Sequence, residues 1–238
     1  QGLGQGGRMR QVVLDTETTG LSWERGNRVV EIGCIELLER RPTGRQFQRY
    51  LNPDREMEPG AQEVTGLTRD FLSDKPRFET GVDEFLDFVR GAELVIHNAD
   101  FDVGFLDSEL ARAGAHYGRL RDHAGVLDTL ALARERFPGQ RNSLDALCKR
   151  LGVDNGHRKV HGALLDAELL AEVYLSMTAG QGDLGLAVAS SQPTPAQRSV
   201  QAGDAVPALR RILRASDEEQ AAHLARLARI GKKAGGRV

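Results

Sequence analysis

Three strand-like runs in succession place the strongest limit on the fold of this chain. They occupy residues 11–15, 28–38 and 45–51. Strands that follow one another through short connections usually pair as an antiparallel meander. Helical spacing of apolar residues follows in residues 80–90, 103–113, 128–137, 143–151 and 162–177, with one more short strand at 93–98. This order predicts an α/β fold in which helices cover a central mixed sheet.

The composition fits a globular protein with a substantial core. The chain has 238 residues, of which 40% are hydrophobic and 28% are charged. No apolar stretch is long enough for a membrane helix, and the N-terminus lacks the apolar segment of a secretion signal. Only Cys34 and Cys148 are present, far apart in the sequence. We therefore expect a cytoplasmic protein that has no disulfide framework and does not associate with membranes.

Charge and composition divide the chain into parts. The net charge is −2, but residues 207–238 carry +5 and residues 1–180 carry −6. Residues 179–206 are rich in Gly, Ala, Ser, Gln and Pro and are typical of a linker. Residues 207–238 regain helical spacing, and Ser216 with Glu219 forms a capping box. We expect a flexible leader or cloning remnant at 1–8, a folded domain at 9–178, a linker at 179–206 and a docking segment at 207–238.

Two acids stand at the end of the first strand, in the sequence VVLDTETTGL. Asp15 and Glu17 are two residues apart, so an extended strand directs both side chains to the same side. Carboxylates are costly to bury and repel each other when they are close. An ordinary turn with an Asp cap explains this stretch equally well when it is taken alone.

Two further acids occupy apolar faces of predicted helices. Asp166 shares its helix face with leucines three and four residues later, although a solvated acid belongs on the opposite face. Asp102 opens a helix whose residues three and four positions later are also apolar. Capping of that helix is the simple structural explanation for Asp102, and Asp100 is a competing candidate in the same loop.

Four carboxylates directed into one interior cannot all ionise without a counter-charge. Divalent cations provide that charge, and oxygen ligands favour Mg²⁺ or Mn²⁺ over zinc. His161 lies five residues before Asp166, which on one helix would set the two about 140° apart. We therefore expect His161 to precede the helix and to act as a general base beside the metals.

These residues match the motifs of a known family. DTETTG (15–20), HNADFD (97–102) and HGALLD (161–166) resemble the three motifs of the DEDDh, or DnaQ-like, 3′→5′ exonucleases, which share the ribonuclease-H-like fold. The resemblance covers roughly residues 10–178. RGAELVIHNADFD and FPGQRNSLDALC are most similar to the proofreading branch of the family, which serves bacterial DNA polymerase III. The three motifs occur in the family's order.

The resemblance implies roles for individual residues. It makes metal ligands of Asp15, Glu17, Asp102 and Asp166, which together hold two divalent cations, Mg²⁺ or Mn²⁺. It makes His161 the base, and it places Thr18, Leu21 and Asn98 beside the terminal nucleotide. Asp100 departs from the family pattern, which often has a small apolar residue there. The implied reaction is two-metal hydrolysis of the 3′-terminal phosphodiester of DNA, releasing 5′-mononucleotides.

The resemblance also suggests protein partners for the tail. Residues 181–186 (QGDLGL) resemble a peptide that binds the sliding clamp, with Gln181, Leu184 and Leu186 as anchors. An ordinary linker stretch is an equally good explanation of this short motif. The amphipathic segment at 207–238 resembles the part that docks on the catalytic (alpha) subunit of DNA polymerase III. Such tethering would replace a strong intrinsic affinity for DNA.

Two other functions remain as alternatives. One is a DEDDh ribonuclease that trims RNA 3′ ends, although such an enzyme has little need for a linker and a docking helix. The other is a non-catalytic scaffold that bridges clamp and polymerase. A scaffold has no reason to bury four acids beside a histidine, so the sequence favours the proofreading exonuclease.

Overall fold

The computed structural model describes residues 9–156 and 160–179. The chain divides into two units, residues 1–186 and 187–238, and every described residue belongs to the first. The predicted leader, the clamp-binding peptide at 181–186 and the docking segment at 207–238 lie outside the described residues. The expected domain boundaries therefore stay predictions.

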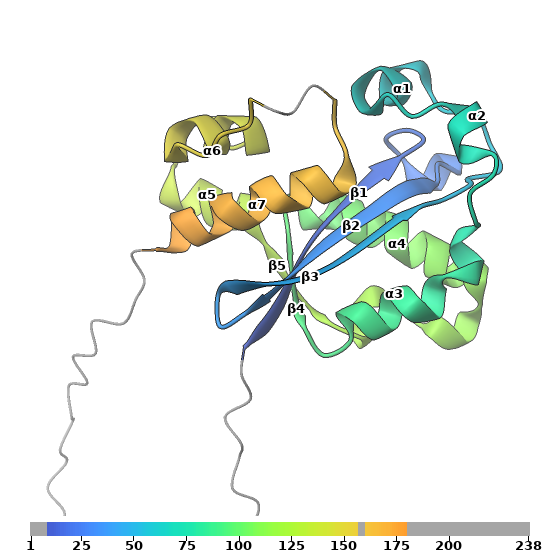
Figure 1. Ribbon diagram of the computed structural model, residues 1–238, viewed down its shortest axis with the longest axis horizontal. Helices are drawn as coiled ribbons and strands as arrows, with labels where there is room; N and C mark the ends of the chain where they lie inside the picture. Colours follow the sequence, from blue (N-terminus) through green and yellow to red (C-terminus); the bar gives the residue numbers. More distant parts are fainter. Residues whose placement is uncertain (1–8, 157–159, 180–238) are drawn as a thin grey trace, which may run out of the picture. The chain divides into compact units, whose positions relative to one another are not determined.

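The described residues form five strands, seven α-helices and four short 3₁₀ helices (Figure 1). The strands are β1 (Arg10–Thr18), β2 (Val29–Leu38), β3 (Arg41–Tyr50), β4 (Glu93–Ile96) and β5 (Gly125–Asp128). The α-helices are α1 (Pro59–Thr65), α2 (Arg69–Leu72), α3 (Val82–Val89), α4 (Ala99–Ala113), α5 (Thr129–Arg136), α6 (Leu144–Leu151) and α7 (Ala163–Thr178). The 3₁₀ helices are η1 (Trp23–Arg25), η2 (Phe78–Thr80), η3 (Ala115–Tyr117) and η4 (Leu120–Asp122).

The strands form one mixed sheet in the order β3-β2-β1-β4-β5. The pairs β1/β2 and β2/β3 are antiparallel, whereas β1/β4 and β4/β5 are parallel. The predicted meander and the predicted mixed sheet are confirmed. Strand β5 was not predicted, because its four residues, GVLD, contain only two consecutive apolar residues, whereas the equally short β4 has three.

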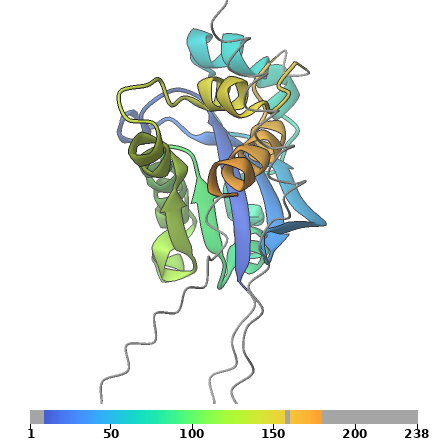
Figure 2. The ribbon, with the colours of Figure 1, turned by 90° about the vertical axis from the view of Figure 1, so that its left-hand side faces the viewer.

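Helices cover both faces of the sheet. On β1, Val12 and Leu14 belong to a large core cluster with residues of α3 and α4, including Phe85 and Phe105. Val13, between them, points to the other face and packs with residues of α7. Figures 1 and 2 show α7, in orange, lying across this second face with α6 beside it. The alternation along β1 thus decides which helix each side chain meets.

The segment between β3 and α3 contains two short helices that the sequence analysis did not predict. Helix α1 has Pro59 in its first turn and ends at Gly66, whose φ of 70° is left-handed. Helix α2 is capped by the Thr68 hydroxyl, which accepts a hydrogen bond from the backbone N–H of Phe71. Neither helix is long enough to display an apolar stripe. Helix α1 nevertheless lines the pocket described below.

Glu36 on β2 connects β1 and β3 through hydrogen bonds, at a point outside the predicted site. Its carboxylate accepts hydrogen bonds from Arg10 Nε at 2.7 Å, Arg45 Nη1 at 2.9 Å and the Thr43 hydroxyl at 2.8 Å. Burial of Glu36 acts to raise its pKa, but these hydrogen bonds and the two arginine charges outweigh it, so the pKa is lowered.

Among the described residues, no helix combines the length and the apolar character that crossing a membrane requires.

Candidate active site

The end of β1 presents acids on one face and a hydroxyl on the other. Asp15 pairs with Gly33 of β2, and Glu17 pairs with Glu31. Residues paired directly across antiparallel strands share a face, so these four positions lie on the face that α7 covers. Thr16 lies on the opposite face, toward α4. Glu17 is 9% exposed, whereas Asp15 is half-buried.

The N-terminal end of α7 docks directly on β2. A Cβ atom added at Gly33 would lie 2.2 Å from the backbone nitrogen of Leu164, so only glycine permits this approach. Glu31 Oε2 accepts a hydrogen bond from Ala163 N at 3.1 Å, and Glu31 Oε1 accepts one from Gln48 Nε2 at 2.8 Å. Glu31 is 1% exposed. It therefore satisfies a backbone donor at a helix start whose cap residue, Gly162, has no side chain to do so.

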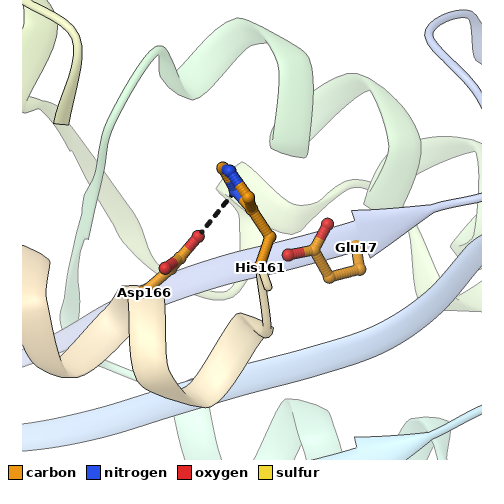
Figure 3. Close-up of side chains that lie close together, drawn as sticks. All are labelled: Glu17, His161 and Asp166. Atoms are coloured by element: carbon orange, nitrogen blue, oxygen red, sulfur yellow. Dashed lines mark ion pairs between the residues drawn. The ribbon is translucent and has the colours of Figure 1, made fainter. Parts of the chain in front are cut away.

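This docking brings three predicted site residues together. Ligand atoms of Glu17, His161 and Asp166 all lie within 4.8 Å of one another. Figure 3 shows Glu17 on β1 facing His161 and Asp166, with His161 just before the start of α7. His161 Nδ1 is 3.2 Å from Asp166 Oδ2. As predicted, His161 precedes the helix that carries Asp166.

The loop that carries His161 is also held by α1. The backbone N–H of His161 donates to the carbonyl of Val64 at 3.0 Å. The His161 side chain is 42% exposed, whereas that of Asp166 is 5% exposed. The imidazole thus stays accessible to water, while the carboxylate beside it is buried.

Asp102 lies on the opposite face of β1, against Thr16. It lies in the first turn of α4, is 3% exposed, and accepts a 2.7 Å hydrogen bond from the Thr16 hydroxyl. Burial, with a smaller contribution from the charge of Asp128, raises the pKa of Asp102 to about 7, although hydrogen bonds act to lower it. Asp100, the competing candidate, is exposed.

The donor set suits a hard divalent cation. Glu17 and Asp166 offer carboxylate oxygens around one imidazole, and Asp15 lies on the same face of β1. Asp15 and Asp102 are not within the 4.8 Å group. The raised pKa of Asp102 reflects the cost of burying its charge. Oxygen-rich ligand sets of this kind fit Mg²⁺ or Mn²⁺.

A pocket of about 360 Å³ adjoins Glu17. Thr18 and Leu21, two of the predicted nucleotide contacts, line it. The Thr18 hydroxyl donates to the Gly20 carbonyl at 2.7 Å and holds the turn, while Leu21 is 82% exposed. Sequence reasoning missed Val64, which is 46% exposed, and Phe101. Exposed apolar side chains at a pocket rim provide surfaces for stacking a base.

Asn98, the third predicted nucleotide contact, lies elsewhere. It lines a separate cleft at the ends of β4 and β5 and adopts a left-handed conformation, with φ of 65°. Sequence reasoning also missed Glu31, although an acid inside the apolar run VVEIGC carried the same signal as Asp15. The predicted clamp contacts Gln181, Leu184 and Leu186 lie outside the described residues.

Comparison with known proteins places this geometry in a family. The family described as Exonuclease matches residues 12–174. The DNA polymerase III subunit epsilon of Escherichia coli (strain K12) is 48% identical to this chain over 231 residues, which cover 95% of each chain. The subunit of the same name from Haemophilus influenzae is 51% identical over 179 residues, 74% of this chain and 70% of that protein. The chain belongs to the DnaQ-like exonuclease family.

Solved exonuclease structures share the fold. Exonuclease X, in complex with 5′ overhanging duplex DNA, has a TM-score of 0.56 and 23% identity, covering 72% of this chain and 93% of that one. Zinc-bound Escherichia coli exonuclease I with single-stranded DNA has a TM-score of 0.61 and 19% identity, covering 73% and 41%. The ribonuclease-H-like fold predicted for this exonuclease is confirmed. The chain is a nuclease, and nucleases of this family are metal-dependent.

Proposed function

We propose that this exonuclease removes nucleotides from DNA 3′ ends as the proofreading activity of a bacterial replicative polymerase. The observation that carries the proposal is the grouping of Glu17, His161 and Asp166 within 4.8 Å beside a nucleotide-sized pocket. The 48% identity to a DNA polymerase III subunit epsilon, over 95% of both chains, supports the replicative role. A replicative role places the protein in the cytoplasm, where a bacterial chromosome lies.

The acids would hold two divalent cations, Mg²⁺ or Mn²⁺. Asp15, Glu17 and Asp166 would bind from the face of β1 that α7 covers, and Asp102 from the start of α4. When bound, such a pair of cations supplies an activated water nucleophile and neutralises charge on the leaving 3′ oxygen. The half-exposed His161 side chain can accept the proton of the attacking water.

The pocket would hold the terminal nucleotide. Leu21 and Val64 at its rim can contact the base without reading its identity, because every base has an apolar face. A mispaired terminus frays more easily than a paired one, so it reaches the pocket at a lower unpairing cost. Preference for errors then arises without recognition of sequence.

The hydrolytic proposal is tested with primers whose 3′ ends are matched, mismatched or made of RNA. In Mg²⁺ the full chain should release 5′-mononucleotides fastest from the mismatched DNA end, and EDTA should stop the reaction. Glu17→Gln removes the charge of a proposed metal ligand and His161→Ala removes the proposed general base, so each should lower kcat by about a hundredfold or more. Glu24→Gln, in the exposed η1 turn, is the matched control. Faster trimming of RNA would favour the ribonuclease, and a wild-type chain that hydrolyses none of the primers would favour the scaffold. Full activity of both site variants would contradict the proposed active site.

The tail would connect the exonuclease to its partners. Residues 207–238 would bind the polymerase catalytic (alpha) subunit, and Gln181, Leu184 and Leu186 would anchor on the sliding clamp, with 179–206 as the linker. Surface plasmon resonance with the full chain tests both contacts. Gln181→Ala with Leu184→Ala should weaken clamp binding alone, and removal of residues 207–238 should abolish polymerase binding. Retention of either contact would remove the corresponding assignment.

A further inference from the structure

A second cleft, of about 570 Å³, opens at the carboxyl ends of β4 and β5. His97 and Asn98 line it from the end of β4, Arg134 from α5, and residues 140–144 from the loop before α6 and its first residue. No acidic side chain is among the described residues that line it. The hydrolytic mechanism leaves this cleft without a role.

Hydrogen bonds fix the walls of the cleft. His97 Nδ1 is 3.0 Å from the Thr129 hydroxyl, and the His97 ring also hydrogen-bonds to the backbone of Asn142. Asn142 is 7% exposed, and its Oδ1 accepts a hydrogen bond from Arg150 Nη1 at 3.0 Å. The loop before α6 is therefore attached to the end of β4, so hydrogen bonds hold the two sides of the cleft together.

Two arginines give the cleft a positive charge. Arg134 and Arg141 are both exposed, and across residues 9–156 and 160–179 no ion pair occupies either guanidinium. Residues 1–180 as a whole carry −6, so this cationic cleft stands out against an acidic body. Guanidinium groups bind phosphate through two parallel hydrogen bonds. Phosphate is therefore the ligand chemistry that the cleft favours.

The cleft adjoins the start of α4, because Asn98, which lines it, is the cap residue of the helix whose first turn carries Asp102. The charge of Asp128, at the end of β5, acts on both Asp102 and His97. Asp128 itself does not line the cleft; its Oδ1 accepts hydrogen bonds from Asn98 N and Leu130 N at 3.1 and 2.8 Å. In Figure 1, α1, which lines the nucleotide pocket, and α6, beside the cleft, lie apart with the N-terminal end of α7 between them.

A DNA strand whose 3′-terminal nucleotide occupies the pocket beside Glu17 extends from there in the 5′ direction, over another part of the protein surface. We propose that the cleft binds the backbone phosphates of the DNA strand on the 5′ side of the scissile bond, with Arg134 and Arg141 as the phosphate contacts. This inference rests on the proposed function, because it takes the acids as the place of cleavage. It assigns Asn98 to the retained strand, and it leaves the terminal nucleotide to Thr18 and Leu21.

Binding in EDTA tests the cleft without hydrolysis. The full chain and its Arg134→Ala/Arg141→Ala variant are titrated with a labelled oligothymidylate at several salt concentrations, using fluorescence anisotropy. Arg136→Ala is the matched control, since this arginine lies on the same helix but does not line the cleft. The double variant should bind more weakly, and its slope of log Kd against log salt should fall by about 1.4, because each single-strand phosphate contact contributes about 0.7. The control should match the wild type.

A small substrate separates the cleft from the active site. Hydrolysis of the p-nitrophenyl ester of thymidine monophosphate in Mn²⁺ needs the acids and the pocket but no upstream phosphate. The double variant should hydrolyse this ester at the wild-type rate and degrade the oligothymidylate with a raised KM. An unchanged salt slope, or equal losses on ester and oligonucleotide, would overturn the cleft assignment. A wild-type chain that binds through the arginines but hydrolyses neither substrate would overturn the proposed function and leave the cleft standing.

Discussion

Glu31 should hold the catalytic end of α7 in place, and its removal should affect stability and turnover together. In Glu31→Ala the backbone N–H of Ala163 and the amide of Gln48 lose their common acceptor inside the protein. Hydrogen bonds to a charged group contribute about 1.5–3 kcal/mol each. A buried donor left unsatisfied costs about 1–3 kcal/mol, which applies to the N–H of buried Ala163 but not to the amide of exposed Gln48. Because the two effects overlap and the site can relax, we expect the free energy of unfolding to fall by about 3 kcal/mol.

The conservative variant should rescue most of this loss. In Glu31→Gln one oxygen still accepts from Ala163, and the Gln48 amide can turn to present its own oxygen to the new NH₂ group. We expect a loss of about 1 kcal/mol, the value of one ordinary hydrogen bond. Turnover should follow the same order, because displacement of α7 moves Asp166, three residues after Ala163, and the preceding His161. KM should change little, because Thr18 and Leu21 lie on another element.

Urea unfolding and steady-state hydrolysis measure the two effects. Glu168→Ala, on the exposed face of α7, is the matched control and should stay within about 0.5 kcal/mol of the wild type. The reasoning is refuted if Glu31→Ala unfolds like the control. It is equally refuted if Glu31→Ala loses stability but keeps the wild-type kcat, since Glu31 would then stabilise the sheet without positioning the site.

Three further predictions follow from the packing. Gly33→Ala should lower the free energy of unfolding by about 1–3 kcal/mol in urea titrations, because the added Cβ would collide with backbone atoms of α7, which cannot rotate away as a side chain can. An unchanged urea midpoint would contradict the close contact between β2 and α7. Cys34 and Cys148 are both buried. Burial, and to a smaller extent the charge of Asp15, raises the pKa of Cys34. A thiol reagent should therefore label neither cysteine until urea unfolds the protein. The lowered pKa of Glu36 contributes stability above its unfolded pKa of about 4.3, and this is lost as pH falls through the folded pKa. Melting curves of Glu36→Gln should therefore depend less on pH below about pH 4.5 than the wild type.

Much of the fold could be predicted because strand and helix periods differ. The apolar runs of β1 and β2 and the apolar stripes of α3 and α7 are long enough to show their period. Strand β5 and helices α1 and α2 are short, and their positions depend on contacts with the rest of the fold rather than on a local pattern. Strand β1 also extends to Thr18, so Glu17 lies within the strand rather than in a turn after it.

The sequence indicates the site residues, because acids occupy positions where apolar residues are expected, but it does not show how these acids are arranged in space. Asp166 and Asp102 each stood on an apolar helix face, and the structure buries both. They lie on opposite faces of β1, and the residues of β1 that each one meets depend on strand register, which no local pattern shows. For the same reason the sequence does not show that Asn98 lines a different cleft from the pocket lined by Thr18 and Leu21.

The central claim is that these acids form a two-metal site, and a Mn²⁺ titration by calorimetry tests it most directly. With thymidine monophosphate present, the wild type should bind two Mn²⁺ ions per chain. The Glu17→Gln/Asp166→Asn variant should lose saturable binding, while Glu24→Gln should behave like the wild type. Two Mn²⁺ ions retained by the double variant, or no saturable binding by the wild type, would contradict the account.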